Sequence, residues 1–373
     1  MTESTSERWQ DQVPVLGDGV ITLRAHRADD VERVVELARD SESVRWTTIP
    51  SPYAAVNAEE FIFGYVAHSW QDGTAMTWAI EFDGRFAGTV EFRGAGQIVD
   101  IGYSVHPDCR GRGVARRAVI AGVEEVFRAG KTVVQWACVV GNESSLRVAH
   151  ACGFRLTAMV PDSLEVRGEV RDAWVGSLHD GDTFEPKTVW RATSFRTDRF
   201  LLRPLEERDD ERIRETLDDP ISRKYLFARP DPLLLEHAAA ERTRKVWNAA
   251  RGETCTWVVS DKETDTYLAD ITMLKIDDVT GAEVGFYTHP ESRGTGVLGE
   301  AVPASVQHAF DVLGFRRLTL LAADSNKGSK SLATRAGMHY YGTQRLAARS
   351  AGIFEDLVAY ELLRDDPDFD GNP

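Results

Sequence analysis

The stretch His106–Ala115, HPDCRGRGVA, decides the fold of this chain. It follows an apolar alternating run, VDIGYSV (99–105), which is typical of a strand. It precedes GVARRAVIAGVEEVFRAG (113–130), a run with helical spacing of its apolar residues. Two glycines between arginines at the join of a strand and a helix indicate a backbone that must lie close to something anionic.

The chemistry of this turn predicts a phosphate site. Gly111 and Gly113 lack Cβ atoms, so their amides can approach a ligand closely and adopt positive φ. The first N–H groups of a helix are unpaired and carry roughly half a positive charge. Arg110 and Arg112 add formal charge beside them, so a phosphate or pyrophosphate is the expected guest.

A second copy of the same arrangement occurs at His289–Leu298, HPESRGTGVL. It again follows a strand-like run, AEVGFYT (282–288), and precedes a helix-like run (299–314). The recurrence argues against an incidental tight turn. The second copy contains GxGxxG, but a dinucleotide fingerprint belongs in the first strand–helix turn of its domain, and this one lies after several strands. No GxxxxGK[ST] string is present, so a P-loop is excluded.

The two turns belong to an internal duplication. ITLRAHRADDVERV (21–34) resembles FLLRPLEERDDERI (200–213). Asp100 and Glu283 lie 183 residues apart, and Asn142 and Asn326 lie 184 apart. A period of about half the chain is too long for a solenoid repeat and predicts two copies of one domain.

Each copy is expected to be an α/β domain with a mixed (α+β) sheet. The order predicted is strand, two helices, two antiparallel strands, a fourth strand, the glycine turn and its helix, a fifth strand, a helix and a closing hairpin. In the first copy, 57–70 is expected to form one of the early helices. The domains are placed at 15–185 and 198–366, with a linker at 186–197.

Composition limits the function further. A chain of 373 residues is long enough for two cores, and its charge of −15 argues against a nucleic-acid partner while remaining compatible with cationic substrates. The sequence contains no run of about 18 uncharged apolar residues, so no membrane-spanning helix is predicted. The polar start MTESTSERWQDQ does not resemble a signal peptide, and the four scattered cysteines suggest neither disulfides nor a metal site. A cytoplasmic, metal-free protein is expected.

At this point the residues resemble a known family. A strand, His-Pro and then Arg110-x-x-Gly113-x-Ala115 is similar to the acetyl-CoA motif Q/R-x-x-G-x-G/A of GNAT N-acetyltransferases. NESSLRVAHACGF (142–154) is similar to the N-x-x-S…G-F element of the RimJ/RimL branch, which acetylates ribosomal-protein N-termini. The resemblance covers nearly the whole chain, twice over. It implies two tandem GNAT-type acyl-CoA N-acyltransferase domains and leaves open an intramolecular pseudo-dimer.

The resemblance implies that the fourth and fifth strands splay apart and hold acetyl-CoA between them. The pantetheine arm would pair with the fourth strand and meet an asparagine, and the pyrophosphate would lie on the turn. The implied cofactor residues are Tyr103, Val105, Arg110, Gly111, Arg112, Gly113, Val114, Ala115 and Asn142, with Arg293, Gly294, Gly296 and Asn326 in the second copy. The alternative for Asn142 and Ser145 is a role in capping the helix that follows, and the two roles are compatible.

The reaction implied is direct attack of a primary amine on the thioester, which needs a base and a donor to the departing thiolate. Asp100 and Glu283 occupy the position of a base glutamate in some relatives, and the alternative is that they are ordinary carboxylates at the start of a strand. The tyrosine that many relatives use as thiolate acid is replaced by Ala149 and Ala333. Ser145 and Ser329 are therefore the expected substitutes, and with Asp100 and Glu283 they are the candidate catalytic residues.

The acceptor and the division of labour between the copies stay open. Trp46 and Tyr53 are candidate substrate contacts, because the resemblance places the acceptor near their loop, although core packing explains them equally well. Leu298 stands where the motif has Ala115, so a crowded second phosphate turn is expected. The amine is a protein N-terminus or a small molecule. The alternative function is an acyl-CoA-binding module without turnover.

Overall fold

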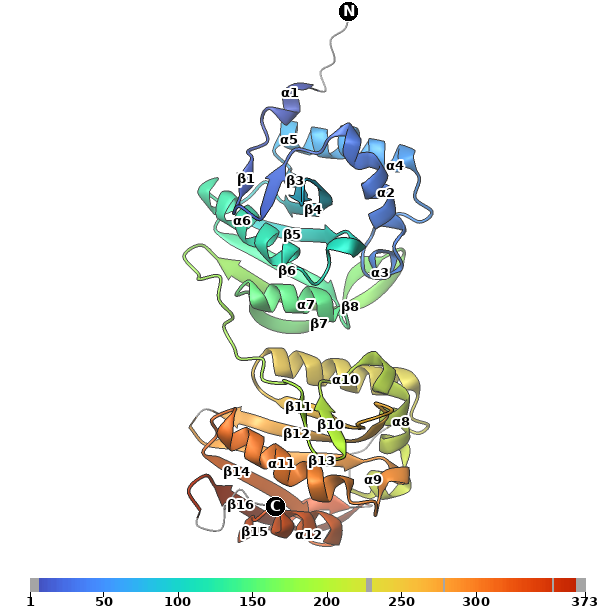
Figure 1. Ribbon diagram of the computed structural model, residues 1–373, viewed down its shortest axis with the longest axis vertical. Coiled ribbons are helices and arrows are strands. Elements are labelled where there is room, and N and C mark those ends of the chain that lie inside the picture. The colour runs from blue at the N-terminus through green and yellow to red at the C-terminus, as the bar shows by residue number, and fades with distance from the viewer. Residues whose placement is uncertain (1–6, 226–229, 278, 351, 367–373) are drawn as a thin grey trace, which may run out of the picture. The chain divides into compact units, whose positions relative to one another are not determined.

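A computed structural model describes residues 7–225, 230–277, 279–350 and 352–366. The chain divides into two compact units, Met1–Lys187 and Thr188–Pro373, each with its own sheet (Figure 1). Strand β9 (Phe195–Arg196) of the second sheet lies inside the segment expected to be a linker. The short helix α1 (Glu7–Gln10) precedes the expected start of the first domain and packs against the first unit.

The first unit contains the elements expected, with small additions at its edge. Its strands are β1 (Leu16–Gly17), β2 (Ile21–Arg24), β3 (Ala75–Phe82), β4 (Arg85–Arg93), β5 (Ile98–Val105), β6 (Val133–Val139), β7 (Arg155–Val166) and β8 (Glu169–His179). Its main helices are α2 (Val31–Arg39), α3 (Ser41–Trp46), α4 (Ala55–Glu59), α5 (Ala67–Asp72), α6 (Val114–Arg128) and α7 (Glu143–Ala151). The mixed α/β fold class is confirmed.

The first sheet has the order β1-β2-β3-β4-β5-β6-β8-β7. Every neighbouring pair is antiparallel except β5 and β6, which are parallel because α6 connects them. Helix α6 packs on the face that carries Phe92, where Gly122 leaves no room for a Cβ against the phenyl ring. Helices α2 and α4 cover the opposite face, where Ala79 and Phe86 join their buried cluster (Figure 1).

The segment expected as one helix over 57–70 differs from the expectation in one respect. A seven-residue π-helix, η2 (Glu60–Val66), separates α4 from α5. The second unit has an uninterrupted helix, α10 (Leu235–Ala250), at this place. A single π turn shifts the side chains that follow by one residue, and hydrophobic periodicity over so short a segment cannot reveal it.

The second unit repeats the architecture. Its strands are β9, β10 (Phe200–Arg203), β11 (Cys255–Asp261), β12 (Tyr267–Asp277), β13 (Gly281–Thr288), β14 (Arg317–Ala323), β15 (His339–Ser350) and β16 (Ile353–Leu363). Its helices include α8 (Asp210–Asp218), α9 (Pro220–Tyr225), α10, α11 (Val297–Asp311) and α12 (Lys327–Arg335). The order β15-β16-β14-β13-β12-β11-β10-β9 matches the first sheet, and β13 and β14 are its parallel pair.

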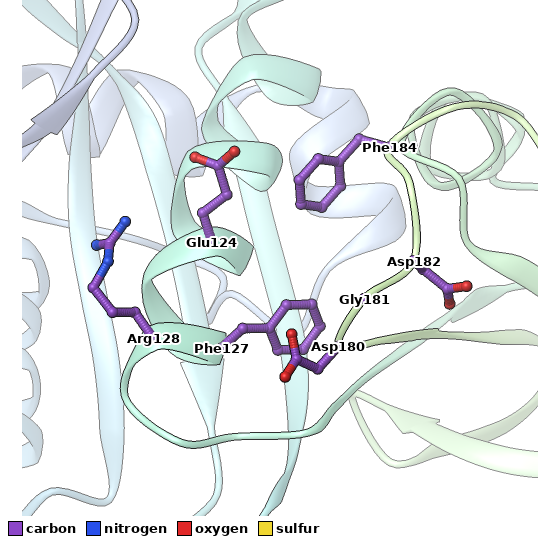
Figure 2. A pocket seen from close by; sticks show the side chains of 7 residues that line it. All are labelled: Glu124, Phe127, Arg128, Asp180, Gly181, Asp182 and Phe184. Atoms are coloured by element: carbon purple, nitrogen blue, oxygen red, sulfur yellow. The ribbon is translucent and has the colours of Figure 1, made fainter.

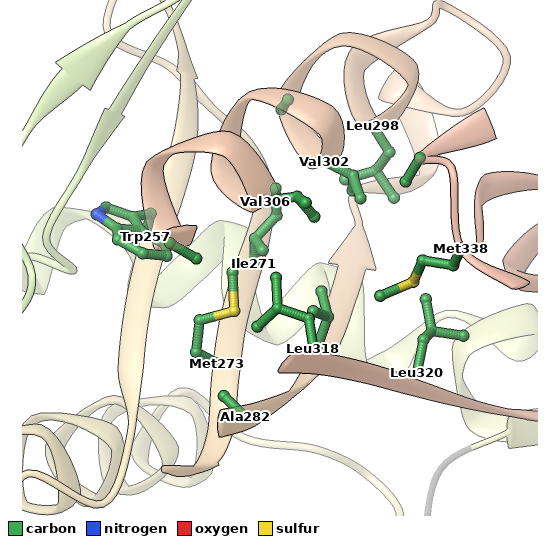
Figure 3. Close-up of a cluster of buried hydrophobic side chains, with 14 of the residues drawn as sticks. Trp257, Ile271, Met273, Ala282, Leu298, Val302, Val306, Leu318, Leu320 and Met338 are labelled. Atoms are coloured by element: carbon green, nitrogen blue, oxygen red, sulfur yellow. The ribbon is translucent and has the colours of Figure 1, made fainter. Parts of the chain in front are cut away.

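Matched buried residues hold both units in the same way. Trp78 donates its indole N–H to the carbonyl of Pro14 at 2.9 Å, and Trp257 donates to that of Thr193 at 2.9 Å. Each tryptophan is fully buried, and Figure 3 shows Trp257 at one end of the second core. Both tryptophans are therefore core aromatics at matched positions of the two units.

Candidate active site

The parallel strands of each unit separate soon after they begin. Strand β5 pairs with β6 only at Ile98, Val99 and Asp100, and β13 pairs with β14 only at Ala282 and Glu283. The rest of β5 pairs with β4 alone. His106 N donates to Ala87 O, so by the alternation of an antiparallel ladder the backbone groups of Tyr103 and Val105 point away from β4, toward the gap.

A glycine turn closes the open end of this gap. Gly111 and Gly113 have φ of 71° and 77°, and Gly113 is the N-cap of α6. Among the residues the structure describes, the amides of 111–116 donate no hydrogen bond to the protein. The second turn has Gly294 and Gly296 at φ of 76° and 85° before α11. Each helix thus presents unpaired amides and the positive end of its dipole, which is an anion site.

Side chains from the preceding helices hold each turn in place. His106 contacts Glu36 of α2 (Nε2 to Oε2, 3.0 Å), and Arg110 Nη2 donates to Asp40 at 2.6 Å and to Ser43 at 3.0 Å. The second unit repeats these contacts with other residues. They are His289–Glu215 at 2.9 Å, Arg293–Asp219 at 2.6 Å and Arg293–Ser222 at 3.0 Å. The turns are therefore built before any ligand arrives.

These contacts change what is expected of Arg110. Its guanidinium already binds Asp40, Ser43 and the carbonyl of Val105. Burial raises the pKa of Asp40, but hydrogen bonds and the Arg110 charge more than offset this and lower it below the usual value. We infer that Arg110 organises the turn through its side chain and offers its backbone to a ligand.

Arg110→Gln and Asp40→Asn are accordingly expected to weaken CoA binding by similar factors, about three- to thirtyfold, because each releases the same turn. Calorimetry with CoA measures both. Arg155→Gln is the control, since the Arg155–Asp182 ion pair lies at the exposed end of β7. If Arg110 bound phosphate directly instead, Asp40→Asn would free its charge and leave the affinity unchanged or higher.

The remaining turn residues differ between the units. The expectation that Leu298 crowds the second turn is wrong, because its side chain is buried in the apolar core beside α11 (Figure 3). The two turns differ instead in the charge of the side chains around them. The first carries Arg112 and Arg117, and the second carries Thr295 and Glu300 at these positions. Arg112 stacks on Phe82 and pairs with Asp83, whereas Glu300 pairs with Arg199 at 2.7 Å.

The asparagine–serine elements cap their helices in both units. Asn142 Oδ1 accepts from the amide of Ser145 at 3.1 Å, and Asn326 Oδ1 accepts from that of Ser329 at 3.1 Å. The capping interpretation is thus confirmed. In the first unit only, the Ser145 hydroxyl also meets the phenol of Tyr103 at 2.9 Å and the indole N–H of Trp136 at 3.1 Å.

The two candidate base carboxylates have different surroundings. Asp100 is exposed on β5, where β6 begins to diverge. Glu283 lies at the corresponding point of β13, but its carboxylate accepts from Lys275 Nζ at 2.7 Å. An exposed carboxylate at the start of the gap is able to take a proton through water, whereas Glu283 is already neutralised by a cation.

A further carboxylate on the same sheet face was missed in the sequence. Glu91 of β4 lies directly opposite Gly102 of β5 and is half-buried. Its oxygens accept from Thr77 at 3.0 Å and from Arg93 at 3.3 Å. Burial and a hydrogen bond to Glu91 raise the pKa of Tyr65, on the π-helix, to about 12. The sequence gives no sign of this role for Glu91, because its neighbours are set by strand register and by the π turn.

Trp46 and Tyr53, the two candidate substrate contacts, do not lie together in one site. Tyr53 is 8% exposed and belongs to the buried cluster between α2, α4 and the sheet. Trp46 is half-buried at the end of α3, where its indole donates to Glu42 at 2.9 Å and Arg45 lies over its ring. The loop that follows Trp46 is tied to the β7–β8 hairpin, because Arg167 donates to the carbonyls of Thr47 and Ile49.

A surface pocket of about 530 Å³ lies elsewhere in the first unit (Figure 2). From the last turns of α6 it is lined by Glu124, Phe127 and Arg128, and from the segment after β8 by Asp180, Gly181, Asp182 and Phe184. The glycine turn is at the other end of this 15-residue helix, roughly 20 Å away at 1.5 Å per residue. The pocket is therefore separate from the gap between β5 and β6.

Comparison with known proteins identifies related chains. The family described as acetyltransferase (GNAT) domain matches residues 21–155 and 199–339. The uncharacterized protein YkkB of Bacillus subtilis (strain 168) is 28% identical over 169 residues, 44% of this chain and 95% of its own. The putative ribosomal N-acetyltransferase YdaF of the same organism is 30% identical over 95 residues, 25% of this chain and 52% of its own.

Solved structures of low sequence identity are also similar. The ribosomal-protein-S5-alanine acetyltransferase of Vibrio fischeri has a TM-score of 0.43 and 17% identity, covering 47% of this chain and 98% of that one. The microcin C7 self-immunity acetyltransferase MccE, solved with acetyl-CoA and AMP, has a TM-score of 0.41 and 21% identity, covering 43% and 93%. Within the described residues, none of the helices combines the length and the apolar character needed to cross a membrane.

Proposed function

The chain belongs to the acetyltransferase (GNAT) family, whose domain it carries twice, and we propose that its first unit transfers an acetyl group from acetyl-CoA to a primary amine. One observation carries this proposal. The gap between β5 and β6 runs from the unpaired amides of 111–116 to the hydroxyl of Ser145. It therefore joins an anion site to a hydrogen-bond donor along one strand edge.

The cofactor is proposed to lie along β5. The pyrophosphate of acetyl-CoA would accept from the turn amides at the start of α6, beside the guanidinium groups of Arg112 and Arg117, which pair with Asp83 and Asp18. The amide groups of the pantetheine arm would pair with the backbone of Tyr103 and Val105, which β6 leaves free. Asn142 caps α7 beside the far end of that arm.

The acceptor is proposed to approach from the opposite face of the sheet. Glu91 and Asp100 lie on that face, Glu91 directly opposite Gly102 and Asp100 two residues before Gly102 on β5. The guanidinium of Arg93, which pairs with Glu91, lies beside Gly102. Together with Arg93, the two carboxylates leave one net negative charge on this face, which favours a cationic acceptor, in keeping with the net charge of −15. The acceptor class is thus a primary ammonium, at a protein N-terminus or on a small molecule.

The residues then divide the chemistry. Asp100, through water, takes a proton from the ammonium, so that the neutral amine forms the new C–N bond as the C–S bond breaks. Glu91 holds the ammonium before attack. The hydroxyl of Ser145 donates to the departing sulfur. No covalent bond to the enzyme is required.

An amine panel tests this function. The intact chain is incubated with acetyl-CoA and with peptides bearing free N-termini, amino acids, polyamines or aminoglycosides, and free thiol is measured. Amine-dependent thiol release is expected from at least one class. Tight CoA binding without release for any amine would instead establish the second candidate, a binding module without turnover. Glu283, neutralised by Lys275, favours that alternative for the second unit.

A further inference from the structure

Three polar side chains span the gap between the diverging strands of the first unit. Tyr103 comes from β5, Trp136 from β6 and Ser145 from α7. Tyr103 Oη lies 2.9 Å from Ser145 Oγ and 3.1 Å from the Ser145 carbonyl oxygen. Trp136 Nε1 lies 3.1 Å from Ser145 Oγ. The serine hydroxyl is thus held from both sides of the gap.

The donors and acceptors determine how this cluster works. An indole N–H can only donate, so Ser145 Oγ accepts from Trp136. Burial raises the pKa of Tyr103 well above its ordinary value, so its phenol stays neutral and keeps its hydrogen. The phenol has a single hydrogen, which the carbonyl oxygen of Ser145 accepts at 3.1 Å. When the phenol turns this hydrogen to Ser145 Oγ instead, the serine accepts two hydrogen bonds, and its own hydrogen is left to donate into the gap. Accepting hydrogen bonds strengthens a hydroxyl as a donor.

We propose that Tyr103 and Trp136 are positioning residues that make the Ser145 hydroxyl a donor to the CoA thiolate, a role that deepens and rests on the proposed function. As the C–S bond breaks, its electron pair stays on sulfur, and the O–H of Ser145 binds that charge without losing its proton. Of the two protons that the ammonium gives up, one finally reaches sulfur and the other goes to solvent.

Tyr103 is better suited to position Ser145 than to act as the acid. A thiol has an ordinary pKa of about 8.5, far below that of this buried phenol, so transfer of the Tyr103 proton to a thiolate would be strongly uphill. Cys138 and Cys152 also lie near the phenol, and burial raises the pKa of each thiol to about 12. Neither cysteine competes with the CoA thiol near neutral pH.

The second unit lacks this device while keeping the serine. Phe286 stands at the Tyr103 position of β13, and Leu320 at the Trp136 position of β14. Neither side chain can donate a hydrogen bond. In the part of the second unit that the structure describes, Ser329 takes part in the Asn326 cap and in no counterpart of the Tyr103 and Trp136 contacts. Stabilisation of the leaving thiolate is therefore a property of the first unit alone.

The test measures the thiolate fraction of CoA bound to the full chain, which requires no acceptor amine. Calorimetry first establishes CoA binding, and Gly296→Glu is included throughout so that only the first unit is loaded. The ultraviolet absorbance of the thiolate is then followed against pH. Tyr103→Phe places in β5 the residue that the second unit already accommodates. Trp136→Phe removes the indole N–H and keeps an aromatic ring, although a smaller one, at this buried position, and Tyr340→Phe on exposed β15 is the control.

The bound thiolate-to-thiol ratio at fixed pH is expected to fall about two- to tenfold in Tyr103→Phe and in Trp136→Phe, and further in Ser145→Ala, with CoA affinity nearly unchanged. A ratio that falls in Ser145→Ala but not in the other two variants overturns the inference. So does a ratio that is the same in all of them. A chain that folds but binds no CoA overturns the proposed function, and calorimetry separates that failure from the other two.

Discussion

Replacing Gly113 by glutamate is expected to abolish CoA binding at the first turn, with a loss of about a hundredfold or more. Gly113 caps α6 with φ of 77°, and a Cβ built on it meets no atom within 4 Å. The new side chain would therefore enter the space above the unpaired amides. Its carboxylate would take the place of the phosphate at the positive end of the helix and repel any that approached.

Gly130→Glu is the matched control for this variant. Gly130 follows the other end of α6, has φ of 87° and is likewise open to solvent. It adds the same charge and the same backbone strain at a distance from the turn. Calorimetry measures CoA affinity in both proteins, and thermal unfolding reports their folding. Wild-type affinity in a folded Gly113→Glu protein would refute the phosphate assignment.

The duplicated fold and the two turns could be predicted from sequence because their signals are local. Glycines at fixed spacing, a strand pattern before them and a helix pattern after them need no knowledge of distant residues. The serine that follows Asn142 could be singled out in the same way. The helix over 57–70 was expected nearly correctly, since only its π turn departs from the regular helical hydrogen-bond pattern.

The contacts that give these residues their roles could not be predicted. The partners of Arg110 and of Ser145 are set by strand register and by helix packing across about 40 to 70 residues of chain. The same holds for Glu91, whose neighbours come from two adjacent strands and a π turn. The prediction that Leu298 crowds the second turn failed because the motif position alone does not tell whether a side chain faces the ligand or the core.

The two units share their scaffold and differ at the gap. Both have the buried arginine–aspartate pair, Arg24–Asp30 and Arg203–Asp209. On the acceptor face, by contrast, Thr272 replaces Glu91 and Leu274 replaces Arg93, as the strand registers place them. Residues that hold the fold were kept in both copies, whereas those around the proposed chemistry were kept in one. Such a pattern favours one catalytic unit.

A buried ion pair further obstructs the acceptor face of the second unit. Lys245 of α10 donates to Asp270 of β12 at 2.8 Å, and the phenol of Tyr267 donates to the same carboxylate at 2.8 Å. Thr89 stands at the Asp270 position in the first unit and carries no charge. Removing either partner would leave a buried charge unpaired, so this site does not open readily to an incoming ammonium.

Turnover is therefore expected to depend on the first turn alone. In the thiol-release assay, with an amine that the wild type accepts, Gly113→Glu should lose about a hundredfold or more of the activity, and Gly296→Glu should stay within about twofold of wild type. Gly314→Glu, at the open, positive-φ position after α11, is the control for charge and strain in the second unit. Loss of activity in Gly296→Glu but not in Gly314→Glu would instead place catalysis in the second unit. Equal losses in Gly113→Glu and Gly296→Glu would show that both turns serve the reaction, and the donors around Ser145 would then no longer explain which unit is catalytic.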